Sequence, residues 1–208
     1  MKSHPNVPKL IGYSIDKMLA VVYDLKAKYP LHHIIREDVA LCTRASMAAK
    51  IGHILQSFHD KGIGIGCIES HSILLDQEDN IYFCDFGLSD RVQAKLNKIN
   101  SQVTTNQGYG FWAPEWDSPY SKWTLERDIY AYGILVLELV KGGIGKITPN
   151  PLEYVRKLES SDAAILGFDI NQLVKRCLSE NPRERPKIGD VAEALDKFIP
   201  NPHQHDAI

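Results

Sequence analysis

The 208-residue sequence has no large excess of charge of either sign, no paired cysteine motif and no apolar run long enough to cross a bilayer. Its 24 basic and 26 acidic side chains give a formal net charge of −2. Such a balance argues against nucleic acid or an anionic membrane as the main partner. The longest apolar run, 129–140, is interrupted by Glu138 and predicts a buried helix, with no membrane segment.

Cysteine is scarce and scattered, which excludes a cysteine zinc site and a disulfide-stabilised fold. None of the four cysteines has the spacing of a zinc site or a disulfide framework: Cys42, Cys67, Cys84 and Cys177. We therefore expect reduced thiols and a cytoplasmic protein. Repeats and low-complexity segments are also missing, and 44% of the residues are hydrophobic, so disorder is excluded and a sizeable core can form.

Hydrophobic periodicity predicts an α+β arrangement, with short strands first and helices after them. We expect strands at 8–13 and 17–24, and a helix from Arg44 whose apolar stripe ends before Gly62. A small hairpin is predicted for 73–76 and 81–84 around the turn-rich 77–80. Helices are predicted at 126–141, 151–159, 169–179 and 187–198, and a flexible tail at 200–208.

Five fragments together resemble the protein kinase superfamily. In chain order they are HPNVPKLIGY at 4–13, Asp85-Phe86-Gly87, Ala113-Pro114-Glu115, ERDIYAYGILVLEL at 126–139 and CLSENPRERP at 177–186. Each fragment alone would be weak, but five in the order of the family are strong evidence. The segments VVYDL and GYGFWAPEW look most similar to the receptor-like, tyrosine-kinase-like branch.

The resemblance implies a kinase-like domain at 1–199 that lacks most of its small lobe. Residues 1–24 would be the remnant of the small lobe with the hinge strand, and 25–199 a mostly helical large lobe with short β-hairpins. In kinases a Gly-rich phosphate loop, a strand lysine and its glutamate partner precede the segment that begins here at His4. We therefore expect a truncated domain.

Three residues match structural positions of the family. Glu115 and Arg185 correspond to a buried ion pair that ties the activation segment to the helical base, a role that suits a bidentate arginine. Asp128 corresponds to the helix aspartate that accepts backbone amides of the catalytic loop. These roles do not require catalysis.

The catalytic loop departs from the family pattern H-R-D-x-K-x-x-N, as in pseudokinases. Cys67 stands at the position of the general base and Glu69 at that of the lysine, while Gly66 replaces the arginine. A thiol is a poor substitute for a carboxylate base, and Glu69 has the wrong sign of charge beside a triphosphate. Ser72, at the metal-binding asparagine position, is a weaker magnesium ligand than an amide oxygen.

Ligand sites follow only from the resemblance. Asp85 would hold magnesium together with Ser72, and the nucleotide contacts would be Asp24, Leu25, Lys26 and Leu74. The altered loop leads us to expect no certain cofactor, with ATP and magnesium bound weakly at most.

Three hypotheses follow. The first is an inactive pseudokinase that acts as a protein-interaction or allosteric module, with a protein partner or self-association at the uncovered strand face of 1–24. The second is an active ATP-dependent Ser/Thr or Tyr kinase that uses Cys67 or His71 as base and receives its small lobe from elsewhere. The third is a fragment of a longer protein, which is compatible with either.

Overall fold

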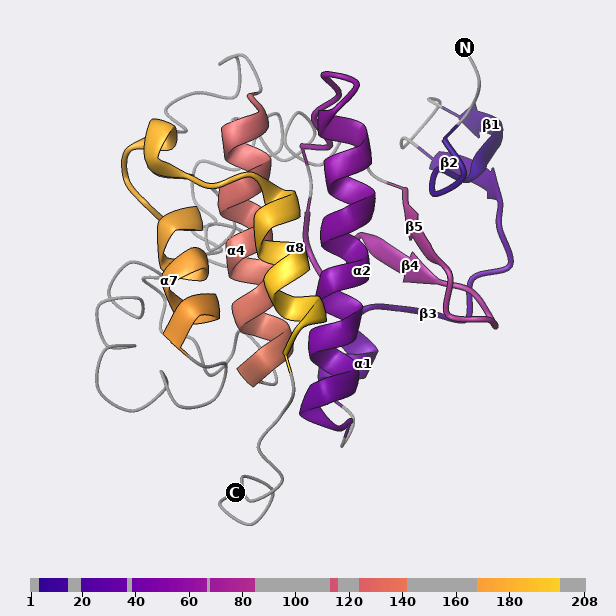
Figure 1. The fold of residues 1–208 in the computed structure, drawn as a ribbon. Coiled ribbons are helices and arrows are strands. Elements are labelled where there is room, and N and C mark those ends of the chain that lie inside the picture. The colour runs from indigo at the N-terminus through magenta and orange to yellow at the C-terminus, as the bar shows by residue number, and fades with distance from the viewer. Residues whose placement is uncertain are drawn as a thin grey trace, which may run out of the picture.

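The computed structural model describes residues 4–14, 20–36, 39–66, 68–84, 113–115, 124–141 and 168–198. These residues form five strands, five α-helices and one 3-10 helix (Figure 1). The elements in order are β1 (Lys9–Ser14), β2 (Ala20–Asp24), β3 (Tyr29–Pro30), α1 (His32–Arg36), α2 (Leu41–His59), β4 (Ile73–Leu75), β5 (Ile81–Phe83), α4 (Leu125–Lys141), α7 (Phe168–Cys177), η3 (Pro182–Glu184) and α8 (Ile188–Asp196).

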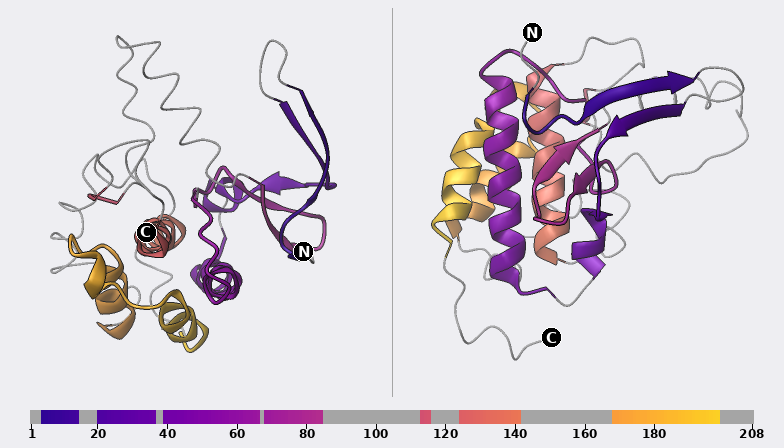
Figure 2. Two further views of the ribbon diagram at one scale, coloured as in Figure 1. Left: turned by 90° about the horizontal axis from the view of Figure 1, so that it is seen from above. Right: turned by 90° about the vertical axis from the view of Figure 1, so that its right-hand side faces the viewer.

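Helix α4 is the centre of the helical layer. Every side chain from 127 to 140 is buried, which confirms the buried helix predicted for 129–140. Helix α4 packs against α2 and α7, and α8 packs in turn against α2 and α7, as the view from above in Figure 2 shows. A helix whose whole circumference is buried needs partners on all sides, so α4 organises the packing of its neighbours.

Two glycines let the helices approach closely. A Cβ atom on Gly52 of α2 would lie 2.8 Å from the Cβ of Ala192 in α8 and would also collide with the hydroxyl of Tyr132 in α4. A Cβ on Gly133 of α4 would lie 2.7 Å from the Cβ of Cys177 in α7. Real Cβ atoms do not come this near to other carbon atoms, so glycine is needed at both helix contacts.

The strands form two separate antiparallel sheets. Strands β3, β4 and β5 pair in that order beside α2, and β1 pairs with β2 in a two-stranded ribbon with a bulge between Leu10 and Gly12. Figure 2 shows the ribbon extending away from the helices. The predicted hairpin at 73–84 is confirmed, and the two N-terminal strands lie within a few residues of their predicted bounds.

The segment that precedes β1 anchors the ribbon to the lobe. The ring of His4 stacks on Phe58 of α2 with 3.9 Å between centroids, and its Nε2 lies 2.8 Å from the hydroxyl of Ser57. The side-chain amide of Asn6 donates to the backbone carbonyl of Ile81. The backbone carbonyl of Asn6 accepts from the backbone amide of Phe83. The HPN sequence therefore joins α2 to β5.

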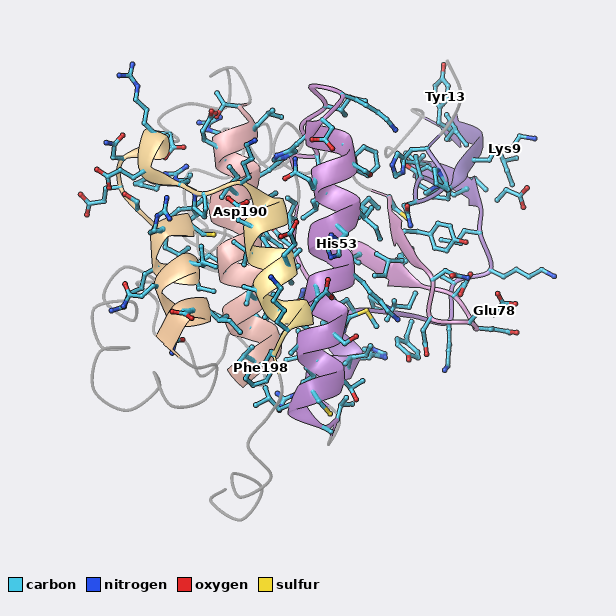
Figure 3. The ribbon with its side chains drawn as sticks, viewed as in Figure 1. Lys9, Tyr13, His53, Glu78, Asp190 and Phe198 are labelled. Atoms are coloured by element: carbon cyan, nitrogen blue, oxygen red, sulfur yellow. The ribbon has the colours of Figure 1, made fainter. Side chains whose placement is uncertain are left out.

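The large hydrophobic side chains that are exposed among the described residues lie on the ribbon. All four large hydrophobic side chains that they expose lie on β1 or β2: Leu10, Ile11, Tyr13 and Val22. Figure 3 shows Lys9 and Tyr13 on the side of the molecule away from α7 and α8. Strands β1 and β2 thus expose apolar side chains, and the partner expected at 1–24 stays a prediction.

Some predictions missed short elements. Helix α1 and strand β3 were not predicted, because five and two residues are too few to show a periodicity. Helix α2 begins at Leu41, three residues before the predicted Arg44. The predicted helix at 151–159 and the tail at 200–208 lie outside the described residues. No helix in the described ranges is long and apolar enough to cross a membrane.

Candidate functional site

The start of the loop at residues 65–72 (the 65–72 loop) is held by Asp128. This fully buried carboxylate in the first turn of α4 accepts hydrogen bonds from the amides of Ile65 at 2.7 Å and Gly66 at 3.0 Å. His59, at the end of α2, places its Nε2 3.0 Å from the same carboxylate. Hydrogen bonds to a buried charge are strong, so α2 and α4 together position the loop. This is the contact that the sequence resemblance led us to expect of Asp128.

A second carboxylate of α4 holds the other end of the loop. The hydroxyl of Ser70 donates to Oε1 of Glu138 at 2.8 Å, and both side chains are buried. The carbonyl of Ser70 accepts from the amide of His32 in α1 at 3.0 Å. Neither Ser70 nor Glu138 was predicted as a site residue, because a serine and a helical glutamate carry no distinctive spacing.

Glu69 and Ser72 close a tight turn on each other. The amide and the hydroxyl of Ser72 both donate to the carbonyl of Glu69 at 3.0 Å, and the amide of Glu69 donates to the Ser72 hydroxyl at 3.3 Å. The serine hydroxyl is thereby used to fold the loop. A bound magnesium would compete with the amide of Glu69 for the side-chain oxygen of Ser72.

Two expected site residues cannot be placed. Cys67, at the base position, and Asp85, at the metal position, lie outside the described residues. Within the described ranges, no three His, Cys, Asp or Glu side chains gather as a set that could hold a metal ion. The predicted magnesium site therefore stays a prediction.

The expected nucleotide contacts lie on neighbouring segments. Asp24 ends β2 and is exposed, and it is followed by half-buried Leu25 and exposed Lys26. Leu74 of β4 is half-buried between its strand partners Pro30 and Tyr82. The chain after Lys26 runs along β4, since the amide of Lys28 donates to the carbonyl of Leu75 at 2.7 Å. The structure thus brings residues 28–30, which follow the expected nucleotide contacts 24–26, to the strand that carries Leu74.

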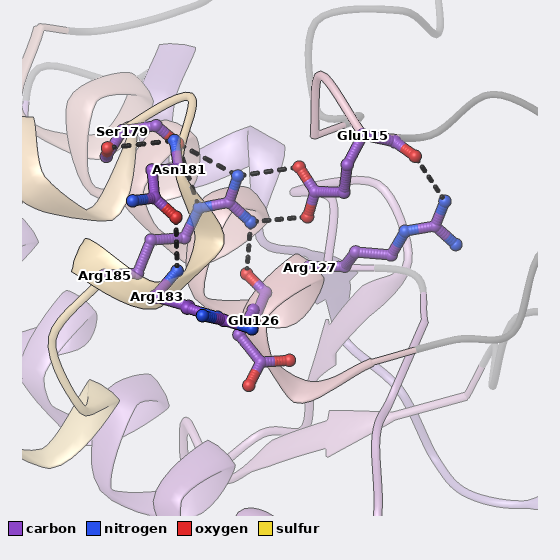
Figure 4. A network of polar contacts seen from close by, with 7 residues as sticks. All are labelled: Glu115, Glu126, Arg127, Ser179, Asn181, Arg183 and Arg185. Atoms are coloured by element: carbon purple, nitrogen blue, oxygen red, sulfur yellow. Dashed lines mark hydrogen bonds and ion pairs between the residues drawn. The ribbon is translucent and has the colours of Figure 1, made fainter.

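Arg185 and Glu115 form a bidentate ion pair at the base of the lobe (Figure 4). Nη1 and Nη2 of Arg185 each lie 2.7 Å from one carboxylate oxygen of Glu115. The guanidinium also donates to the carbonyls of Ser179 and Glu126, and it lies over the ring of Tyr130. The expected ion pair is therefore present, and it links residues 113–115, α4 and the η3 region.

The electrostatics of this cluster follow from burial and charge. Burial of Glu115 by itself raises the pKa of its carboxyl, but the hydrogen bonds and charge of Arg185 outweigh that effect and leave the pKa below its usual value. Burial raises the pKa of Tyr130 to about 12, even though the charge of Arg185 acts in the other direction. Both groups are therefore held in one ionisation state at neutral pH.

A cavity of about 340 Å³ lies elsewhere, between the first half of α2 and the β4–β5 turn. Its lining residues are Cys42, Thr43, Ser46, Met47, Lys50 and Asp79. No predicted site residue is among them. This cavity is unrelated to the 65–72 loop.

Comparison with known proteins gives a consistent result. Residues 1–195 match a family model described as protein tyrosine and serine/threonine kinase. The chain is 29% identical over 232 residues to the serine/threonine-protein kinase PBL34 of Arabidopsis thaliana. The alignment covers 98% of this chain and 46% of that protein.

Two other Arabidopsis thaliana proteins are similar to the same extent. The calcium/calmodulin-regulated receptor-like kinase 1 is 28% identical, with 94% of this chain and 49% of that protein aligned. The serine/threonine-protein kinase BIK1 is 27% identical, with 96% and 58% aligned. The chain spans about half the length of the relatives that it matches.

Proposed function

Because the chain belongs to the family of protein tyrosine and serine/threonine kinases, we propose that it is a pseudokinase that acts as a protein-interaction or allosteric module. One observation carries this proposal. The 65–72 loop is held in place by Asp128, while the hydroxyl of Ser72 at its metal-binding position is hydrogen-bonded to the backbone amide and carbonyl of Glu69. The support of the loop has been kept, but the side chains on it are unsuited to phosphotransfer.

The chemistry of the altered positions supports this proposal. A general base contributes about 10²–10⁴-fold to a rate, and the thiol of Cys67 supplies little of it at neutral pH. Glu69 would repel the phosphates whose charge the family lysine stabilises. Gly66 offers no side chain to receive a phosphorylated activation segment.

A phosphotransfer assay tests the proposal. The purified chain is incubated with radiolabelled ATP and magnesium, alone and with a generic protein substrate, beside the variant Asp85→Asn. We expect no incorporation above that of the Asp85→Asn control. Incorporation that disappears in Asp85→Asn would overturn the proposal. A variant that combines Cys67→Asp, Glu69→Lys and Ser72→Asn shows in parallel whether these three positions limit activity.

Nucleotide binding is measured separately. A ligand at 100 times its Kd stabilises a folded protein by about 2.7 kcal/mol, which a thermal-shift titration detects easily. We expect at most a small shift with ATP and magnesium at millimolar concentration. A large shift would favour the second candidate function.

That second candidate is an active ATP-dependent Ser/Thr protein kinase. It is favoured by the names of the relatives and by the retained contacts of Asp128 and of the Glu115–Arg185 pair. Its base would be Cys67 or His71, and the ring of His71 stacks on His32 with 4.2 Å between centroids. Loss of phosphotransfer in His71→Ala, with Cys67→Ala unaffected, would identify that base.

The proposed partner is another protein that covers the exposed apolar side chains of β1 and β2, or a second copy of the chain. A two-stranded ribbon with exposed apolar side chains is marginal alone and gains stability from an added layer. The cytoplasm stays the proposed compartment, supported by the free thiols of Cys42 and Cys177.

A further inference from the structure

The imidazole of His4, in the segment before β1, uses both of its ring nitrogens. Nδ1 accepts a hydrogen bond from the backbone amide of Asn6 at 3.2 Å. Nε2 lies 2.8 Å from the hydroxyl of Ser57 in α2. That hydroxyl donates its single proton to the carbonyl of Ile54 at 2.6 Å, so toward His4 it acts as the acceptor. These hydrogen bonds assign a neutral ring with its proton on Nε2.

A second proton on His4 has to bind at Nδ1, to which the amide of Asn6 already donates. A protonated imidazole carries a donor on each nitrogen and has no acceptor left. Two N–H groups would then face each other, and the contact between His4 and Asn6 would be lost. The neutral ring is therefore a condition for this contact.

The His4–Asn6 contact matters because Asn6 also binds β5. Its side-chain amide donates to the carbonyl of Ile81, and its backbone carbonyl accepts from the amide of Phe83, both at 2.9 Å. Ile81 and Phe83 are the first and last residues of β5, and the ring of His4 stacks on Phe58 of α2. Residues 4–6 thus fix the place where the chain that enters β1 meets both α2 and β5.

The surroundings of the ring favour its neutral form. Burial lowers the pKa of His4 below its ordinary value of 6.5, and the positive charge of Lys61, just after α2, acts in the same direction. The other titratable side chains of β5 and of the end of α2 are engaged with different partners: His59 with Asp128, Asp60 with Gln56, and Tyr82 with Asp76. Geometry and electrostatics therefore agree on the neutral form.

We propose that His4 is a proton-sensitive fastening of the β1–β2 ribbon, in which the neutral ring holds residues 4–6 against α2 and β5 and protonation loosens them. The fastening acts whether or not the chain transfers phosphate. It controls how firmly the ribbon, with its exposed apolar side chains, is attached to the helices.

The direction of the pH effect follows from proton linkage. Because the pKa of His4 is lowered in the folded state, the folded chain binds this proton less tightly than the unfolded chain does. The stability that neutral His4 adds is present above the ordinary pKa of 6.5, and it is lost as pH falls through the folded pKa. One proton changes an opening equilibrium by at most about tenfold per pH unit.

Amide hydrogen exchange of the whole chain at pH 7.5 and pH 5 tests the fastening. The reporters are the amides of Asn6 and Phe83, which donate to His4 and to Asn6. The references are the amides of Lys28 and Leu31, which donate to β4. After correction for intrinsic exchange, we expect reporter protection to fall below pH 6.5, by up to about tenfold per pH unit, while protection of the references stays constant.

The tautomer of His4 is measured independently in the parent chain. A proton–nitrogen correlation spectrum of the histidine rings at pH 7.5 should show the proton of His4 on Nε2. A proton on Nδ1 would overturn the proposal. Because this spectrum needs no variant, the proposal stays testable if a substitution at His4 prevents folding.

Variants distinguish the fastening from a general loss of stability in acid. His4→Phe keeps a ring for Phe58 but cannot be protonated, so its reporters should be less protected at pH 7.5 and should show no further fall at pH 5. The control is His33→Phe, the same change at an exposed histidine of α1, which should behave as the parent chain. Parent reporters that do not depend on pH, a fall shared by the references, or a pH dependence that persists in His4→Phe would each contradict the proposal.

Discussion

The side chain of Arg185 is fully buried although it carries a charge, and its hydrogen bonds explain how. A guanidinium has five N–H donors. In this chain they meet the two oxygens of Glu115, the carbonyl of Glu126 and, twice, the carbonyl of Ser179. Because every donor is used, the cost of burying the charge is offset and the arginine can join three segments.

Glu115→Gln tests the worth of this pair and its dependence on pH. The variant leaves a buried guanidinium without its carboxylate, and the loss of one partner from a buried pair costs about 3–5 kcal/mol. Because Glu115 keeps about a quarter of its side chain exposed, we expect the lower end of that range at pH 7, measured by urea denaturation. Glu126→Gln is the control, since that exposed side chain leaves the carbonyl acceptor intact.

The pKa of Glu115 also predicts how its contribution to the free energy of unfolding changes as the pH falls. The pKa of Glu115 is lowered in the folded state, so the stability that it adds is present above the ordinary pKa of 4.5. That stability is lost as pH falls through the folded pKa. The difference between the parent and Glu115→Gln should therefore shrink in acid, and a difference that stays constant to pH 3 would contradict the ion-pair interpretation.

At the scale of elements, the crossing of α2, α4 and α8 depends on one glycine. Gly52 lies where the Tyr132 hydroxyl donates to the carbonyl of Ala48 at 2.9 Å, so an added methyl group would collide with that tyrosine and with Ala192. Sequence periodicity predicted the helices, but it did not show which glycine lies at their contact. That information arises only when the three helices are packed.

Gly52→Ala should therefore destabilise the fold, although alanine favours helices. Overpacking costs about 1–3 kcal/mol, against a gain in helix propensity of about 1 kcal/mol, and loss of the buried tyrosine hydrogen bond adds to the cost. We expect a lower midpoint of thermal unfolding. Gly12→Ala is the matched control, because a Cβ at Gly12 meets no atom within 4 Å. Equal midpoints for Gly52→Ala and the parent would show that the helices can move apart at no cost.

Short elements mark the limit of sequence-based prediction at this scale. Strand β3 has two residues and is defined by its pairing with β4, so its formation depends on a partner more than 40 positions away. Helix α1 is held by backbone bonds to the loop, such as that from His32 to Ser70. A local pattern cannot reveal elements whose stability comes from distant contacts.

At the scale of the whole molecule, the exposed apolar side chains of the ribbon predict association. Ile11 and Val22 are 65% and 52% exposed, although soluble chains rarely gather such residues on one surface. Light scattering coupled to size exclusion should show a mass that rises with concentration for the parent chain, and a monomer for the double variant Ile11→Thr and Val22→Thr. The pair Lys9→Thr and Asp24→Thr, on the same two strands, should leave the association unchanged. A parent chain that stays monomeric at high concentration would contradict self-association.

The sequence by itself determined the class of the fold, the family resemblance and the identity of the altered loop residues, because motifs and periodicity are local properties of the chain. It also predicted that Glu115 would meet Arg185 and that Asp128 would hold the loop, since each lies in a fragment of that resemblance. Only the tertiary structure decided that Glu138 lies against Ser70, with no hydrogen-bond partner in the described part of the chain for its other carboxylate oxygen. Burial and hydrogen bonding between residues 68 positions apart arise from packing, and no local pattern encodes them.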